Sequence, residues 1–357
     1  MNVAVLGAGG TIAPAIVRDL AESEEAESLL LLDLDGERAE AVAERHGGGK
    51  ARSAAVDARS GLASDLGGVD VLVNAASYRV NLDAMRACLE AGCHYLDLGG
   101  LYHMTRRQLE LDDEFREAGL LALLGMGSSP GKTNVMAAKA VRELGEQPRS
   151  VDVIAAGRDL DPPPGFSVPY ALRTLIDELT LPPMVVRDGE PEELEPLTPG
   201  GTVSFPEPIG EAEAIYTLHS EVLTFPSSFG CSESSFRLSL APPLLERLRE
   251  LASAGEERIE RAAREAVPPS ARTVSVHVVV ADAATVTAIT RPMERWGLGG
   301  GIVSTAAPAA AAVRLLARGR IEARGALPPE LCIEPDDLFP QLQLRNCRFD
   351  LEVNVAR

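Results

Sequence analysis

The amino terminus combines a buried strand, a glycine turn, a helix and a second apolar strand that ends in an acid. "VAVLGAGGTIAPAIVRDLA" predicts the strand, turn and amphipathic helix, and "LLLLDLD" predicts the next strand. Gly7 and Gly9 occupy the first two positions of G-x-G-x-x-G, and Ile12 stands at the third. Such a turn brings backbone close to a pyrophosphate, so the sequence predicts a dinucleotide-binding fold.

Asp33 ends the second strand, a little over twenty residues past the glycines, where an acid bonds the ribose hydroxyls of NAD. No arginine follows Asp33 directly, and a 2′-phosphate would meet its negative charge. We therefore expect NAD as the cofactor, with NADP the weaker alternative. The other interpretation of Asp33 is an ordinary strand-end or helix-capping carboxylate.

Strands and helices continue to alternate. Further strands are expected to end at Asp57, to run over Asp70–Ala76 and His94–Gly99, and to include "LLALLG"; one helix is expected over about 81–91. Mostly apolar strands that alternate with helices are typical of an α/β, Rossmann-type doubly wound parallel sheet.

Ligands of such sheets bind beyond the carboxyl ends of the strands. The residues that follow these ends are therefore the predicted cofactor-binding residues: Gly7, Gly9, Gly10, Thr11, Ile12, Asp33, Asp57, Ala75, Ala76, Ser77, Gly127, Ser128 and Pro130.

"GMGSSPGKTNV" follows the last of these strands and ends in Gly-Lys-Thr like a phosphate loop. A phosphate loop needs a glycine five positions before its Gly-Lys, and that position is Met126. We therefore expect this loop to lie near the nicotinamide end of the dinucleotide rather than a triphosphate. A kinase-like role that depends on Lys132 is the least favoured alternative.

Composition limits the remaining classes of protein. A chain of 357 residues exceeds the usual size of one core, so two domains are expected. A formal net charge of −19 disfavours nucleic acid and anionic membranes. Five cysteines without Cys-x-x-Cys spacing suggest neither disulfides nor a metal site. The amino terminus has no basic leader, so we expect a cytoplasmic protein.

The segment from Asn74 to Asn134 resembles the saccharopine dehydrogenase-like oxidoreductases, a family that includes L-lysine 6-dehydrogenase. Its asparagine-containing strand end, "AGCHYLD" and "GMGSSPGKTN" follow the family's order. "FPEPIG", "HSEVLTFP" and "STAAPAAAAVRLLARGRIEARGALPPE" extend the resemblance over most of the chain.

The resemblance implies a domain organisation. Residues 1–132 would form the dinucleotide-binding domain, and residues 133–303 an inserted α+β domain for substrate binding and dimerisation. Residues 304–357 would return to the first domain. Proline-rich stretches after Arg149 and strand-like segments such as "RTVSVHVVVADAATVTAIT" are compatible with the α+β insertion. The resemblance also implies a homodimer.

The family exchanges hydride between a nicotinamide and a carbon that bears an amino group, so groups that move protons are needed. Asp97, Tyr78 and His219 are the candidates. Asp97 has the alternative of a structural carboxylate, and Tyr78 that of a packing aromatic. We expect His219 and Glu221 to lie on one strand, where alternate residues share a face.

An amino-acid substrate requires a partner for its carboxylate, and arginine suits this role best. Arg173 and Arg237 are the candidates, with Glu221 and Tyr102 as further substrate-binding residues. Lys132 is expected at the start of a solvent-facing helix, and binding of a phosphate or carboxylate is its alternative.

The expected function is NAD-dependent oxidation of an amino acid, of the L-lysine 6-dehydrogenase type. A saccharopine or carboxynorspermidine-type imine reductase is the enzymatic alternative. From another class, a non-catalytic dinucleotide-binding regulator remains open, because Ile12 departs from the glycine pattern.

Overall fold

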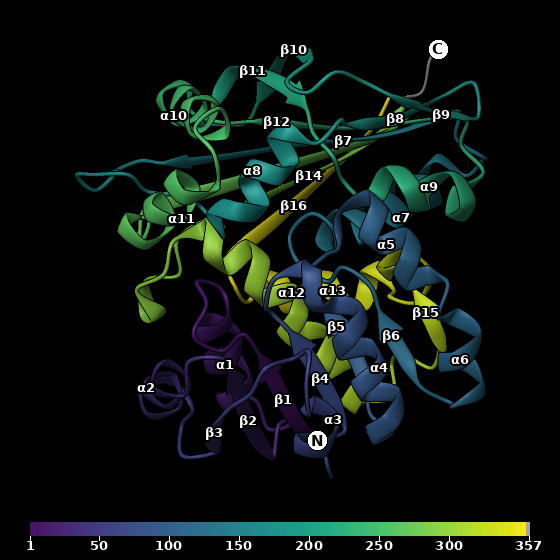
Figure 1. Cartoon of the computed structure of the whole chain (residues 1–357). Helices are drawn as coiled ribbons and strands as arrows, with labels where there is room; N and C mark the ends of the chain where they lie inside the picture. The colour runs from purple at the N-terminus through teal and green to yellow at the C-terminus, as the bar shows by residue number, and fades with distance from the viewer. Residues whose placement is uncertain (355–357) are drawn as a thin grey trace. The chain divides into compact units, whose positions relative to one another are not determined.

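The computed structural model describes residues 1–354, and these divide into two compact units (Figure 1). Unit 1 consists of Met1–Val135 and Thr305–Gln341, and unit 2 of Met136–Ser304 with the described residues from Leu342 on. The chain therefore leaves the first unit, builds the second and returns.

Unit 1 is built on a parallel sheet of seven strands in the order β15-β6-β5-β4-β1-β2-β3. The strands are β1 (Asn2–Leu6), β2 (Ser28–Asp33), β3 (Ala51–Ala55), β4 (Val71–Asn74), β5 (His94–Asp97), β6 (Leu121–Leu123) and β15 (Gly325–Leu327). The predicted doubly wound α/β sheet is confirmed. Its strand order reverses next to β1, which is where such sheets bind their ligands.

Helices cover both faces of this sheet. They are α1 (Ala13–Ala21), α2 (Gly36–His46), α3 (Leu62–Asp65), α4 (Asn81–Ala91), α5 (Leu101–Leu109), α6 (Asp112–Glu117), α12 (Gly300–Ala317) and α13 (Pro335–Gln343), with short 3-10 turns η1 (Tyr78–Val80) and η3 (Pro329–Leu331). Leu62, Met85 and Phe115 of α3, α4 and α6 share a core with Leu72 of β4. Val313 and Leu316 of α12 line a small internal void with residues of β4, β5 and β6, among them Tyr95.

Helix α12 is the only described helix that is long and apolar enough to cross a membrane. However, 72% of it is buried inside the protein. Ala309, Ala310 and Ala311 have no exposed surface, as expected of a helix packed in a core. Its apolar character is therefore explained by burial within the fold.

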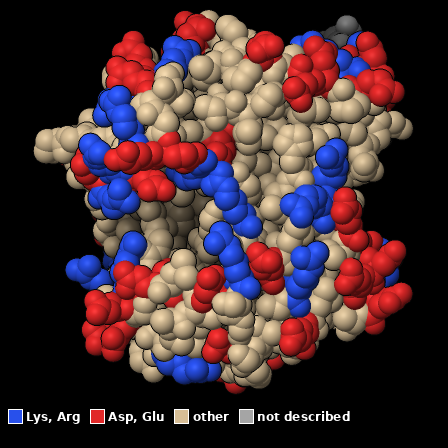
Figure 2. Space-filling view, in the orientation of Figure 1, with Lys and Arg blue, Asp and Glu red and all other residues tan. Residues whose placement is uncertain are grey.

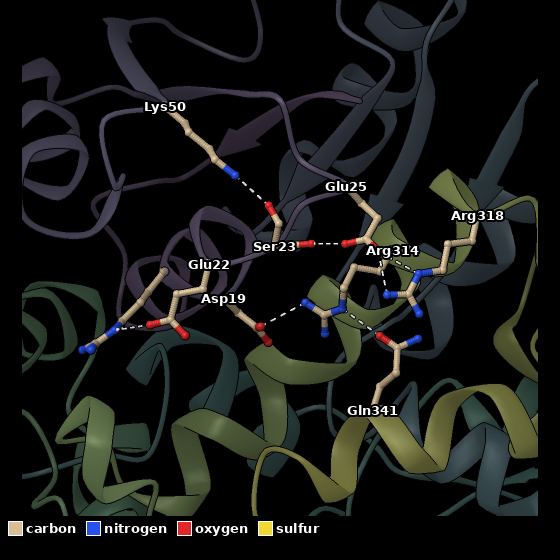
Figure 3. Close-up of polar contacts among 9 residues, drawn as sticks. Asp19, Glu22, Ser23, Glu25, Lys50, Arg314, Arg318 and Gln341 are labelled. Atoms are coloured by element: carbon tan, nitrogen blue, oxygen red, sulfur yellow. Dashed lines mark hydrogen bonds and ion pairs between the residues drawn. The ribbon is translucent and has the colours of Figure 1, made fainter.

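Polar contacts fasten α12 to the end of α1 (Figure 3). Arg314 donates to Asp19 Oδ1 at 2.9 Å and to Gln341 Oε1 of α13 at 2.7 Å, and this arginine is buried. Arg318, the residue directly after α12, donates to Glu25 Oε1 at 2.6 Å. Burial raises the pKa of Glu25, but hydrogen bonds from Ser23 and Arg318 outweigh it and lower this pKa to about 2.

Unit 2 contains a mixed nine-stranded sheet. Its main path is β10-β11-β12-β7-β13-β14-β16, and β8 pairs with both β12 and β9. The strands are β7 (Ser150–Asp159), β8 (Met184–Arg187), β9 (Glu190–Glu193), β10 (Pro199–Phe205), β11 (Gly210–Tyr216), β12 (Glu233–Ser239), β13 (Thr273–Ala281), β14 (Ala284–Thr290) and β16 (Cys347–Val353). Only β7 and β12 pair in parallel among these described strands, so the predicted α+β character is confirmed.

Helices of unit 2 are α8 (Leu172–Thr180), α9 (Glu221–Phe229), α10 (Pro242–Ala252) and α11 (Glu256–Glu265), with the 3-10 turn η2 (Glu294–Trp296). Helix α7 (Lys132–Leu144) begins in unit 1 and continues into unit 2. Residues 342–354 differ from the expected return to the dinucleotide domain. Strand β16 instead pairs with β14 from Cys347 to Val353, because a free sheet edge offers unpaired backbone groups to that strand.

Charged side chains of both signs are interspersed over the visible surface (Figure 2). The chain carries 53 Asp and Glu against 34 Lys and Arg. The acidic excess is therefore spread over this face rather than gathered in one block.

Candidate functional site

The glycine turn after β1 is held in place by its neighbours in unit 1. Gly7 has a φ of +76°, and a side chain there would bring Cβ within 2.6 Å of the Ala76 backbone. The Gly7 N–H donates to Leu32 O at 2.8 Å. Only glycine fits this position, so the turn is a close backbone approach between β1 and β4.

Helix α1 begins directly after this turn. Ile12 occupies the N-cap position, and no side chain caps the helix. Thr11 is exposed and does not cap the helix. Ile12 is buried, so only its backbone can contribute to a ligand. The open helix end and the glycine turn fit an anionic group such as a pyrophosphate.

Asp33 lies beside the same turn. Its Oδ2 accepts from the Gly9 N–H at 2.8 Å, and its Oδ1 accepts from the Asp35 N–H at 3.0 Å. The Arg38 guanidinium donates to Gly9 O across the turn. Sequence inspection missed this arginine because it lies in the first turn of α2, five residues beyond the acid. A carboxylate and a guanidinium thus both border the expected ribose position.

The remaining predicted cofactor residues lie along the same carboxyl edge. Asp57 follows β3 and is exposed, and its Oδ1 accepts from the Arg59 N–H at 3.0 Å. Ala75 and Ala76 follow β4, and the Ala75 N–H donates to Leu6 O at 2.9 Å. Ser77 is exposed, and Tyr78 begins η1 half-buried, with the Arg79 guanidinium 5.1 Å from its ring centre.

Asp97 is a buried acceptor with five donors. Its Oδ2 accepts from Asn81 Nδ2 at 3.1 Å, Tyr95 OH at 2.9 Å and Gln108 Nε2 at 2.6 Å. Its Oδ1 accepts from the N–H groups of Gly99 at 2.9 Å and Gly125 at 2.7 Å. The side chain is only 1% exposed.

These five hydrogen bonds bear on the expected role of Asp97 as a proton-transfer group. Burial raises the pKa of Asp97, and hydrogen bonds from Gln108, Gly125, Tyr95 and Gly99 oppose that shift without cancelling it. Every neighbour donates, which suits an ionised carboxylate whose oxygens are already engaged. The geometry favours the alternative interpretation, a structural carboxylate.

The loop after β6 packs tightly around Pro130. Gly125 has a φ of +78°, and a Cβ there would lie 2.6 Å from Pro130 Cγ. Gly127 is buried and its carbonyl accepts from the Lys132 N–H at 3.0 Å. Ser128 is half-buried. The loop is therefore one compact block at the carboxyl edge of the sheet.

Lys132 corrects an expectation. It is only 1% exposed, so it does not begin a solvent-facing helix. The preceding loop covers the first turn of α7: the Thr133 N–H donates to Ser128 O at 3.2 Å, and Asn134 Oδ1 accepts from the Gly131 N–H at 2.7 Å. Tyr102 is also buried, in α5, and its ring meets exposed His103 edge-on at 5.3 Å.

Unit 2 brings His219 between two acids. His219 Nδ1 lies 3.5 Å from Glu221 Oε2, and its Nε2 lies 3.9 Å from Glu178 Oε2. The Tyr170 hydroxyl donates to Glu178. The His219 ring stacks on Phe236 of β12 with centres 3.5 Å apart. All three ionisable groups are buried.

The expected pairing of His219 with Glu221 forms, but not on a strand. Strand β11 ends at Tyr216 and α9 begins at Glu221, so the two residues meet across a helix start. Glu178 comes from α8, far away in the sequence, and no local pattern indicates it. Its position becomes visible only when α8 and α9 are placed in the fold.

Mutual electrostatics shift the titration of this cluster. Burial lowers the pKa of His219, but the hydrogen bond and charge of Glu221 and the charge of Glu178 outweigh it, so the net shift is upward. Burial raises the pKa of Glu178, helped by the charges of Glu221 and Asp177 and opposed by His219 and Tyr170. His219 and Glu178 therefore hold their protons more strongly than isolated side chains do.

The two arginines expected to bind a substrate carboxylate already have protein partners. Arg173 Nε lies 3.3 Å from Asp177 Oδ1, and its guanidinium also pairs with Glu256. Arg237 Nη1 donates to Gly200 O at 3.0 Å, which ties β12 to β10. Both contacts give these arginines a structural role in unit 2.

Similarity to known proteins agrees with this geometry. Residues 3–123 match the family model of the saccharopine dehydrogenase NADP binding domain. Carboxyaminopropylagmatine dehydrogenase of Synechocystis sp. is 27% identical over 271 residues, which cover 72% of this chain and 67% of that protein. Carboxynorspermidine synthase of Vibrio alginolyticus is 30% identical over 95 residues, 24% of this chain and 23% of that protein.

One solved structure shows the same fold over nearly the whole length. Saccharopine dehydrogenase (L-Glu forming) from Saccharomyces cerevisiae, in its apo form, has a TM-score of 0.69 and 16% identity, and the alignment covers 98% of this chain and 99% of that chain. Residues 3–123 are therefore similar to the saccharopine dehydrogenase NADP binding domain, and the chain as a whole shares the fold of saccharopine dehydrogenase.

Proposed function

We propose that this protein is an NAD(P)-dependent imine reductase, or dehydrogenase in the reverse direction, that acts on the CH–NH group of a carboxylated polyamine. The observation that carries the proposal is the glycine turn with Asp33 hydrogen-bonded to it at 2.8 Å. The relatives supply the substrate class, because their names describe carboxylated derivatives of agmatine and norspermidine.

The proposed substrate differs from L-lysine, the substrate expected from the sequence. L-lysine 6-dehydrogenase activity has no support among the relatives described above, whereas the carboxynorspermidine-type alternative has. A bound nicotinamide dinucleotide supplies hydride transfer. Asp33 is suited to hold its ribose hydroxyls, which favours NAD, whereas Arg38 beside the turn is suited to a 2′-phosphate.

The protein must position the substrate and transfer protons during this reaction. In the oxidative direction a substrate C–H gives a hydride, the nitrogen loses a proton, and water hydrolyses the imine to an amine and an aldehyde. Tyr78, which begins η1 after β4, is our candidate on the nicotinamide side of the predicted crevice. His219, with Glu178 and Glu221, is the candidate of unit 2 for taking up the proton.

A substrate panel tests the proposal. The purified protein is incubated with NAD or NADP and carboxyaminopropylagmatine, carboxynorspermidine, saccharopine or L-lysine, and reduced cofactor is followed by its absorbance. We expect kcat/KM for a carboxylated polyamine to exceed that for L-lysine. Turnover of L-lysine alone would restore the first expectation. Cofactor binding without any turnover would support the non-catalytic regulator.

A further inference from the structure

Asp97 connects two loops of unit 1 that border the predicted cofactor site. Its Oδ1 holds the Gly99 and Gly125 N–H groups, and its backbone carbonyl accepts from the Met126 N–H at 2.6 Å. The start of the loop after β6 is therefore fixed by two oxygens of one residue, Asp97 Oδ1 and the Asp97 backbone carbonyl. Buried hydrogen bonds to a charged acceptor are stronger than ordinary ones.

The same carboxylate reaches the loop after β4 through two asparagines. Asn81 Nδ2 donates to Asp97 Oδ2, and Asn81 Oδ1 accepts from Asn74 Nδ2 at 2.9 Å. Asn74 Oδ1 in turn accepts from the Ala76 N–H at 3.0 Å. Ala76 is the residue against which Gly7 packs, so the network extends to the wall of the glycine turn.

Gln108 and Tyr95 complete the network around Asp97. Gln108 is fully buried in α5 and makes the shortest side-chain contact to Asp97, at 2.6 Å. The Tyr95 hydroxyl donates to Asp97 and accepts from Asn74 Nδ2 at 3.2 Å. Burial and the Asp97 charge raise the pKa of Tyr95, so this hydroxyl keeps its proton and remains a donor.

The position of Asp97 in the sheet determines which half of the cofactor it affects. Asp33 ends β2 and Asp97 ends β5, three strands away in the order β5-β4-β1-β2. At a strand spacing of about 4.8 Å, the two ends are roughly 14 Å apart. A dinucleotide with its adenosine ribose at Asp33 and its pyrophosphate at the β1 turn would bring its nicotinamide toward the loops that Asp97 fixes.

We propose that Asp97 is a positioning residue that holds the loops after β4, β5 and β6 in the arrangement that receives the nicotinamide half of the dinucleotide. The inference rests on the proposed dinucleotide-dependent function. Asp97 acts through backbone N–H groups and amide side chains rather than by touching the substrate. Small displacements of such loops are costly, because hydride transfer depends strongly on geometry.

The test compares two ligands that share the adenosine half. NAD and ADP-ribose are titrated into wild type, Asp97→Asn and Gln108→Met, and the Kd of each ligand is measured by calorimetry. We expect the Kd for NAD to be about tenfold higher in Asp97→Asn than in wild type, and to increase by a smaller factor in Gln108→Met. The Kd for ADP-ribose should be unchanged in both variants. Asp112→Asn is the matched control, because that acid accepts from the Ala326 N–H at the start of β15.

Other outcomes overturn the inference. An unchanged Kd for NAD in both variants would show that the loops do not need Asp97. Equally weakened binding of NAD and of ADP-ribose would indicate general disruption of unit 1. Normal binding with loss of one limb of the kcat/KM pH profile in Asp97→Asn would make Asp97 the proton-transfer group.

Two controls separate this inference from the proposed function. Gln108→Met keeps the carboxylate and tests the network if Asp97→Asn does not fold. Wild-type protein that binds neither NAD nor NADP would contradict the proposed function itself, whereas failure of the inference leaves wild-type binding intact.

Discussion

Asp33 and Asp97 are both aspartates at strand ends, yet their surroundings give them different roles. Asp33 is half-exposed and is held by two backbone N–H groups, which leaves its outer side accessible to a ligand. Asp97 is buried beneath five donors. The sequence identified both positions, but it did not distinguish an accessible carboxylate from a buried one.

The reason is that the network around Asp97 draws on four different elements. Asn74 and Tyr95 lie in β4 and β5, and Asn81 and Gln108 lie in α4 and α5. Nothing local in the sequence shows that these amides converge. The position of Asp33, by contrast, follows from one contiguous strand-turn-helix-strand unit.

Asp33 carries a prediction on cofactor choice. Asp33→Ser should raise the KM for NAD by about tenfold or more, because hydrogen bonds from ribose hydroxyls to a charged acceptor are lost. The KM for NADP should be unchanged or lower. Steady-state kinetics with both cofactors measure the ratio of the KM for NAD to the KM for NADP. Asp35→Ser is the control, because a serine at this position can still cap α2. Equal losses with NAD and NADP would contradict a role in ribose recognition.

His219 carries a prediction on pH dependence. Its folded-state pKa is raised, so the stability contributed by the imidazolium is present below about pH 6.5 and is lost as the pH rises through the folded-state pKa. The groups that face it are Glu178, Glu221 and, through Glu178, Tyr170 and Asp177. The Tm of the wild-type protein should therefore fall as the pH rises.

The variant His219→Gln should flatten this dependence, and His103→Gln should not, because His103 is exposed. Glu178 contributes in the same direction as His219, since its raised pKa also means that the folded state binds an extra proton. The difference between the wild-type and His219→Gln curves isolates the histidine. Parallel curves would show that His219 does not titrate with folding.

At the scale of elements, the helix over 81–91 was predicted with the bounds that the structure gives. Its amphipathic pattern is complete within the segment itself. The segment around His219 was predicted as a strand and contains a helix start, because the pattern there is short and mostly apolar. Strand β16 was also missed, since its pairing with β14 depends on an edge that the sequence does not reveal.

Two arginines, one in helix α12 and one directly after its end, allow a matched comparison of stability. Arg314→Met leaves Asp19 buried without its main partner and should cost about 3–5 kcal/mol of unfolding free energy. Arg318→Met removes a pair whose arginine is 51% exposed, and should cost at most about 1 kcal/mol. Chemical denaturation of both variants measures the difference.

A double variant tests why Arg314→Met is destabilised. Asp19→Leu combined with Arg314→Met removes both charges and should recover much of the stability lost in Arg314→Met. If the double variant is as unstable as the single one, lost packing rather than an uncompensated charge explains the effect.

At the scale of the whole molecule, the α/β sheet and the α+β second unit were predictable, because each depends on the sequence of strand and helix patterns. The pairing of Glu178 with His219 was not, because segments far apart in the sequence bring these two side chains together. A homodimer and a cytoplasmic location stay predictions. Sedimentation analysis of the purified protein tests the first.

The central claim is hydride transfer between a nicotinamide and a carbon attached to nitrogen in a carboxylated polyamine. The most direct measurement uses reduced cofactor that carries deuterium at the transferring position of its ring, in the reductive direction, with the amine and aldehyde that hydrolysis of carboxyaminopropylagmatine would give. We expect one deuterium on the carbon bonded to the new secondary amine, located by mass spectrometry. Product without deuterium, or cofactor bound and not consumed with any polyamine, would contradict the account.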